Sequence, residues 1–328
     1  MKFFKYLILF SILISALHSC KKESGNKWEI KLENEFPNVQ LTDISKTFYD
    51  SSIPLDQFKE KYPWFQGSVS DADYSARRAD IEEIKIYKEA IAKINQPKLK
   101  EDLTLLFAHI ENYFPDFKTP QVFLFSSDLQ MAQDPVFLEP KNNLLFIDIT
   151  GFMGENNPYY KGMEHYFQVS MNPQNIIPKV SATIANQLIR PDKNHQKFLD
   201  KIIFEGKLLT LQDAFLPTEP DYLKMNYSQK QYEWAEANEE NIWNFFVENN
   251  LVFSDDPRLE ERFLSVGPFS KFYTAIDNES SPQIGIFSGW QICRKYFKQK
   301  RDTKLQDFLK MDAQTIFNDA QYRPKTPN

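Results

Sequence analysis

Apolar residues recur at helical spacing along most of this 328-residue chain. Leu99, Leu103, Leu106 and Ile110 lie three or four positions apart, which places them on one face of a helix. Gly and Pro interrupt the pattern at intervals and mark helix ends. The pattern predicts short helices near 43–48 and after Pro54, and longer ones over 75–94, 97–113, 173–190, 194–213, 228–249, 258–264, 282–298 and 312–320.

Two segments depart from this helical spacing. Residues 121–126 (QVFLFS) and 144–150 (LLFIDIT) are rich in aromatic and β-branched residues, as β-strands are. Three turn signals lie between them, at Asp134-Pro135, Glu139-Pro140 and Asn142-Asn143. We therefore expect one small sheet of two to four strands in an α+β, mainly helical fold. No internal repeat divides the chain, so residues 41–328 are predicted to form a single domain.

The N-terminal end has the pattern of an export signal. Residues 6–17 are apolar except for two serines, and two lysines precede them. This run is shorter than the ~20 apolar residues that a membrane-spanning helix needs, but it suits a secretory signal. It stops at Leu17-His18-Ser19-Cys20, which resembles a lipobox. We expect residues 1–19 to be removed and the thiol of Cys20 to be acylated, anchoring the chain in a membrane.

A polar stretch over 20–40 follows the predicted cleavage point, and we interpret it as a tether. The only other cysteine is Cys293, so an exported form has no internal disulfide. By analogy with known bacterial lipoprotein export signals, Lys21-Lys22 after Cys20, in place of an acidic run, favours a protein that faces the periplasm over one at the cell surface. The pattern leaves open whether the inner or the outer membrane holds the anchor.

The charge balance excludes some partners. The whole chain carries 39 basic and 45 acidic residues, for a net charge of −6. Without Lys2 and Lys5 the balance is 37 against 45, or −8. An acidic chain argues against binding to nucleic acid and against electrostatic binding to anionic lipid head groups.

Local sequence offers few residues for catalysis. His109, His165 and His195 survive removal of the signal, but no two of them lie four positions apart, and HExxH is absent. The chain also has no nucleophile motif, phosphate loop or dinucleotide glycine pattern. We expect each histidine to be a structural or surface residue.

Three glycines lie within predicted helices, where Gly costs about 1 kcal/mol relative to Ala. Gly206 follows Glu205 in an apolar run, and Gly285 and Gly289 lie four positions apart. We interpret them as points of close helix contact. The alternative is that they give another group access to a pocket.

In its order of short segments, the chain resembles the gliding motility lipoprotein GldB family of the Bacteroidetes. The resemblance implies a role in gliding motility and the associated protein secretion, together with other envelope proteins. It covers most of the mature chain and depends on residues 146–148, 159–162, 176–178, 205–207, 234–239, 268–273, 289–292 and 321–324.

That family is similar to zincin-type metallopeptidases, which carry HExxH on one helix and a Glu on the next. The resemblance places Ala182 and Asn186 at the two histidine positions, Thr183 at the catalytic Glu and Glu205 at the third ligand. One carboxylate cannot hold zinc, and no general base is left to activate water. The resemblance therefore implies a zincin-like scaffold with no catalytic residues, no metal and no cofactor.

These observations lead to three hypotheses. The first is a membrane-anchored, non-enzymatic scaffold that acts by protein contact. The second is a zinc hydrolase whose ligands assemble from distant parts of the chain, such as Glu205 with His165 and either His109 or His195. The third is a carbohydrate- or peptide-binding lipoprotein that uses its aromatic residues, which make up 15% of the chain.

Overall fold

The computed structural model describes residues 26–32, 35–65, 69–191, 196–275 and 277–324. The predicted signal peptide and Cys20 lie outside the described residues, as does His195. Within these ranges, no helix is long and apolar enough to cross a membrane.

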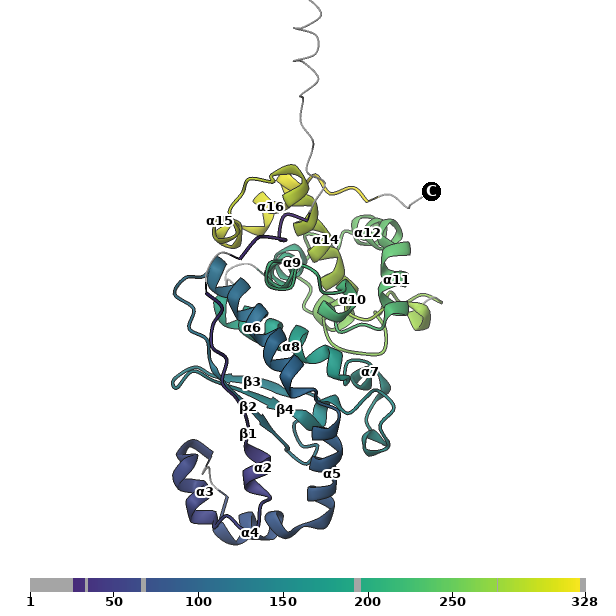
Figure 1. Cartoon of the computed structure of the whole chain (residues 1–328). Coiled ribbons are helices and arrows are strands. Elements are labelled where there is room, and N and C mark those ends of the chain that lie inside the picture. The colour runs from purple at the N-terminus through teal and green to yellow at the C-terminus, as the bar shows by residue number, and fades with distance from the viewer. Residues whose placement is uncertain (1–25, 33–34, 66–68, 192–195, 276, 325–328) are drawn as a thin grey trace, which may run out of the picture.

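One four-stranded sheet lies in the middle of the molecule (Figure 1). Its order is β1 (Leu41–Asp43), β2 (Gln121–Phe125), β4 (Leu144–Asp148) and β3 (Val136–Glu139). The β1–β2 and β2–β4 pairs are parallel and the β4–β3 pair is antiparallel. Both predicted strands are confirmed, and the fold is α+β and mainly helical, as the sequence predicts.

The two faces of the sheet belong to two hydrophobic clusters. Side chains alternate across a strand, so Phe123 and Phe146 face one side and Leu124 and Ile147 face the other. The two phenylalanines pack with α2, α3 and α4, a group of short helices called the distal lobe below. Leu124 and Ile147 belong to the main core, which extends through the C-terminal helices. Burial on both faces explains the continuous apolar run in β4.

Most of the predicted helices begin and end close to the predicted positions, but the short helices His165–Gln168, Asp221–Lys224 and Leu305–Lys310 were not predicted. Two predicted helices are each divided in two. Asp80 caps a new helix with its carboxylate inside the range 75–94, and Asn238 separates two helices inside 228–249. The bounds are α2 Ile44–Phe48, α3 Leu55–Lys61, α4 Asp71–Ala79, α5 Ile81–Ala92, α6 Gln96–Tyr113, α7 His165–Gln168, α8 Ile176–Leu188, α9 Phe198–Phe215, α10 Asp221–Lys224, α11 Gln229–Ala237, α12 Glu239–Glu248, α13 Arg258–Phe263, α14 Ile284–Gln299, α15 Leu305–Lys310 and α16 Ala313–Ala320.

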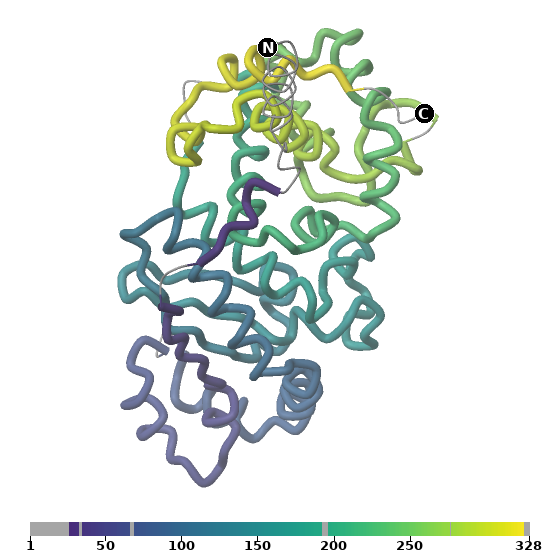
Figure 2. The backbone as a smooth tube through the Cα atoms, turned by 45° about the horizontal axis from the view of Figure 1, so that its top comes forward, coloured from purple at the N-terminus to yellow at the C-terminus, as the bar shows by residue number. Residues whose placement is uncertain are grey.

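The start of the described chain differs from the tether predicted for 20–40. Trp28 is buried and Val39 is only 1% exposed, so both belong to the main core. In Figure 2 this purple segment runs from beside the C-terminal helices toward the sheet. The sequence did not predict this packing because the segment is mostly polar. Its contacts are made by two apolar side chains and by hydrogen bonds from Asn26 and Lys27. Residues 26–32 and 35–40 of the predicted tether are therefore part of the folded domain.

Candidate functional site

Three residues aligned with the peptidase motif lie together on α8. Ala182, Thr183 and Asn186 line a cavity of about 300 Å³ beside the edge strand β3. The Thr183 hydroxyl donates to the Lys179 carbonyl at 2.9 Å, and the Asn186 amide donates to the Ala182 carbonyl at 3.0 Å. The Thr183 hydroxyl also lies 3.5 Å from the Val136 carbonyl of β3. None of the three residues is a histidine or a carboxylate, so they supply neither the usual ligands of zinc nor a general base.

Lys179 is the basic residue of this cavity, and Asp134 is its acidic residue. Burial lowers the pKa of the Lys179 ammonium to about 8, against a smaller opposite effect from Asp134. Among the described residues, no carboxylate lies within ion-pair distance of it. Across the cavity, the buried Oδ1 of Asn226 also has no hydrogen-bond partner among these residues. The cavity therefore combines a buried cation, the carboxylate of Asp134 and an amide oxygen without a partner.

Glu205 lies elsewhere, on α9, in a second cavity of about 660 Å³ shared with Lys207, Glu260 and Met311. None of the three α8 residues lines that cavity. Burial, reinforced by the charge of Glu260, raises the pKa of Glu205 to about 7. The residues that the resemblance assigns to one pocket thus line two different cavities.

Replacing Glu205 with glutamine is expected to remove a pH dependence of folding. A carboxyl whose pKa is 4.5 unfolded and about 7 folded holds its proton in the native state, so stability falls as pH rises between these values. The loss is about 3 kcal/mol at most. Urea denaturation of the wild type from pH 4 to 8 should show this decline, and Glu205→Gln should flatten it. Replacing the exposed Glu101 with glutamine is the control, and an unchanged slope in Glu205→Gln contradicts the prediction.

Neither of the two described histidines lines the cavity of Glu205. His109 lines a third cavity, of about 450 Å³, where burial lowers its pKa and leaves Nδ1 without a hydrogen-bond partner among described residues. His165 begins α7 and is exposed, with Nε2 3.7 Å from the Glu155 carboxylate. Over the described ranges, no three His, Cys, Asp or Glu side chains converge as metal ligands.

The helical glycines mark a close crossing of α9 and α14. A Cβ added at Gly289 would collide with the backbone of Ile202, and one added at Gly206 would collide with the backbone of Gly289. The side chain of Cys293 lies beside the same crossing, 2.8 Å from the Cβ position of Gly206. The interpretation of these glycines as helix contacts is confirmed, and Glu205 lies next to this crossing without taking part in it.

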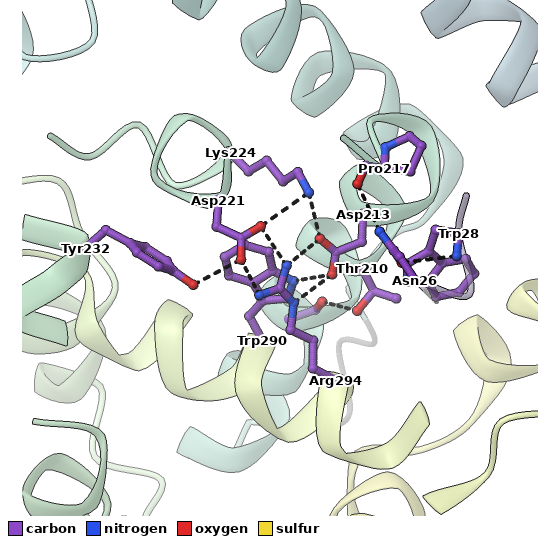
Figure 3. A network of polar contacts seen from close by, with 11 residues as sticks. Asn26, Trp28, Thr210, Asp213, Pro217, Asp221, Lys224, Tyr232, Trp290 and Arg294 are labelled. Carbon is purple, nitrogen blue, oxygen red and sulfur yellow. Dashed lines mark hydrogen bonds and ion pairs between the residues drawn. The ribbon is translucent and has the colours of Figure 1, made fainter. Parts of the chain in front are cut away.

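A buried ion network was not anticipated from the sequence (Figure 3). Asp213 of α9 accepts from Lys224 at 2.9 Å, from Arg294 at 2.7 and 2.9 Å, and from the indole of Trp290 at 2.8 Å. Asp213 and Lys224 are each only 4% exposed. The available signal was Asp213 itself, a charged residue inside the apolar run LLTLQDAF.

Asp221 completes the network. Its carboxylate accepts from Arg294 at 2.5 and 2.8 Å and from the hydroxyl of Tyr232 at 3.1 Å. Burial would raise the pKa of Asp221, but the hydrogen bonds and charge of Arg294 outweigh it and lower that pKa. With Asp213 and Lys224, the network holds two anions and two cations. These charges are paired with one another, and the network joins α9, α10, α11 and α14.

The comparisons with known proteins agree with the sequence resemblance. The family model GldB_lipo, described as "Gliding motility protein GldB", matches residues 25–324. Neither the curated proteins nor the solved structures gave a match. The matched range begins one residue before the described chain and includes the docked N-terminal segment, all four strands and every helix from α2 to α16. The family name implies a gliding motility lipoprotein of the cell envelope. Because the match covers most of its length, the chain belongs to the GldB family.

Proposed function

We propose that the protein is a lipid-anchored component of gliding motility and of the associated protein secretion, acting by contact with other envelope proteins. The family match over residues 25–324 carries this proposal. The lipobox-like sequence ending at Cys20 lies just before the matched range and supplies the residue for the anchor. On this view the folded domain is held at a membrane, facing the periplasm, where it meets its partners.

The side chains of α8 that line its cavity support a role in protein contact over a role in catalysis. Ala182, Thr183 and Asn186 cannot hold zinc, and none of them can activate water as a general base. Glu205, the remaining acid of the aligned motif, lines a separate cavity. Metal analysis of the purified protein tests this reading, because stoichiometric zinc that is lost on Glu205→Ala would establish the hydrolase hypothesis instead.

Deletion of the gene is expected to abolish spreading of a motile strain on agar. Reintroducing the wild-type gene should restore spreading. Reintroducing the Ala182→Leu variant, which fills the α8 cavity, should restore it too if this cavity is not a catalytic centre. Normal spreading of the deletion strain would sink the motility proposal, whereas a folded Ala182→Leu protein that fails to complement would place function in the cavity.

Cys20→Ser is expected to abolish labelling by palmitate, because only a thiol accepts the diacylglycerol group that precedes further acylation. The matched control is Cys293→Ser, since Cys293 is the only other cysteine and lies fully buried. Metabolic labelling followed by immunoprecipitation should show lipid on the wild type and on Cys293→Ser, and none on Cys20→Ser. Label that persists in Cys20→Ser means that Cys20 is not the anchor.

A further inference from the structure

The docked segment, residues 26–32, is held to one end of the molecule by hydrogen bonds. The Asn26 amide donates to the Pro217 carbonyl at 2.9 Å, as Figure 3 shows. The Lys27 ammonium donates to the carbonyls of Arg301 and Thr303 at 2.8 and 3.1 Å. These acceptors follow the C-terminal ends of α9 and α14, so the segment leaves the domain at this end.

Aromatic packing reinforces the attachment. Trp28 is 8% exposed and meets Phe297 and Tyr113 edge to face, with ring centroids 5.0 and 6.0 Å apart. The Lys27 ammonium lies 4.1 Å from the ring centroid of Phe297 and 4.8 Å from that of Trp28. Cation–π and aromatic contacts of this kind each contribute about 0.5–1.5 kcal/mol. The segment is therefore fixed in place at Trp28.

This attachment limits how far the domain can stand from its anchor. Cys20 and Asn26 are six residues apart, and six extended residues span at most about 20 Å. The distal lobe lies beyond the sheet from the docked segment (Figure 1). Packed layers are about 10 Å apart, so several layers separate the two. The lipid must enter the membrane on the side of the docked segment, away from the distal lobe.

One segment at this end is basic, although the chain as a whole is acidic and Lys300 of this segment lies 3.8 Å from the carboxylate of Asp319 in α16. Residues 294–304 contain six Lys and Arg and a single acid, Asp302. By contrast, residues 41–80, which include the distal lobe, contain five basic and seven acidic residues. Exposed side chains form the basic surface, which we define as Lys298, Lys300, Arg301 and Lys304.

We propose that the docked segment and the basic surface form the membrane-facing side of the anchored protein, and that the basic surface binds the anionic head groups of phospholipids. This inference rests on the lipid anchor of the proposed function. Each Lys or Arg near an anionic bilayer contributes about 1 kcal/mol, which orients a domain whose anchor is already inserted. The distal lobe then points away from the bilayer and is presented to partners. The acidic net charge of the chain hides this local basic surface.

The orientation can be measured with the full-length lipidated protein in vesicles of phosphatidylcholine and phosphatidylglycerol. A fluorophore is attached to a cysteine introduced at Gln299, beside the basic surface, or at Ala76 in the distal lobe, both exposed. Cys293 is buried and stays unlabelled. With a quencher on the lipid head groups, we expect several-fold stronger quenching at position 299 than at 76. Equal quenching at the two positions would overturn the orientation.

Two variants separate the parts of the proposal. Trp28→Ala should release the docked segment, so that the flexible chain between the anchor and the domain extends from Cys20 to about Val39. The longer chain lets the domain turn relative to the membrane, and the difference in quenching between positions 299 and 76 should become smaller. Reversal of Lys298, Lys300 and Lys304 to Glu should also shrink it, and only in vesicles that contain phosphatidylglycerol. The charge-matched control is the triple reversal of Lys46, Lys88 and Lys141, all exposed and outside residues 294–304.

The outcomes distinguish this inference from the proposed function. Protein that carries no palmitate and stays off the vesicles contradicts the lipid anchor itself. Lipidated protein whose quenching difference is the same in pure phosphatidylcholine contradicts head-group binding, and a difference that survives Trp28→Ala contradicts the docked segment as the orienting contact. A difference that the Lys46, Lys88 and Lys141 control also removes would likewise reject the basic surface.

Discussion

Gly289→Ala is expected to destabilise the protein by about 3 kcal/mol, which is the upper end of the usual cost of overpacking a core. The added Cβ would collide with the backbone of Ile202. A backbone cannot relieve such a clash by changing rotamer, as a side chain can. In an open helix the same change stabilises by about 1 kcal/mol, because Ala is the better helix former. The sign of the effect therefore reports whether α9 and α14 cross backbone to backbone.

Urea denaturation followed by circular dichroism measures this effect. Gly206→Ala, on the other side of the crossing, should lower the midpoint as well. Gly267→Ala is the control, because the nearest atom to its added Cβ is 3.9 Å away, and it should leave the midpoint close to the wild-type value. A Gly289→Ala midpoint at or above that of the wild type would falsify the close crossing.

The crossing of α9 and α14 at their glycines is a feature of the fold that the sequence could predict in part. Close approach of another helix is a frequent reason for glycine within an apolar helix, so this contact could be predicted at Gly206 and Gly289 without knowing which helix approaches, and the structure decides between it and access to a pocket. The two long strands were predictable for the same kind of reason, because Leu144–Asp148 has no polar alternation and must be buried on both faces.

Other features depend on contacts between distant residues and leave no local pattern. The edge strand β1 is the three-residue segment LTD, which forms because Leu41 pairs with Val122 far along the chain. Asp213 and Arg294 are 81 positions apart, so neither predicts the other. The attachment of Trp28 to Phe297 spans the whole domain. The grouping of Ala182 with Glu205 came from resemblance, and the fold assigns them to different cavities.

Asp213→Asn is expected to cost about 3–5 kcal/mol, the usual result of removing one partner of a buried ion pair. Asparagine keeps the shape of the side chain, but its amide cannot accept hydrogen bonds as a carboxylate does. Lys224 is 4% exposed and would lose its closest carboxylate, and Arg294 would keep only Asp221. Urea denaturation of the purified variant measures the loss.

The control is Asp256→Asn, whose partner Arg258 lies at 2.7 Å and is 79% exposed to solvent. Exposed pairs contribute little, so its midpoint should stay near that of the wild type. Asp221→Asn should fall between the two, because its partner Arg294 is only 25% exposed but keeps both bonds to Asp213. The predicted order of loss is Asp213, then Asp221, then Asp256.

The double variant Asp213→Asn with Lys224→Met decides whether the cost comes from an uncompensated charge. If the loss in Asp213→Asn reflects a buried ammonium without its anion, removing that ammonium should restore part of the stability. A double variant less stable than either single variant would show instead that the two side chains act by packing. Restored stability in the double variant would show that losing a single partner of the network is costly because it leaves a buried charge unpaired. The intact network would then keep α9, α10 and α14 in one arrangement near the docked segment.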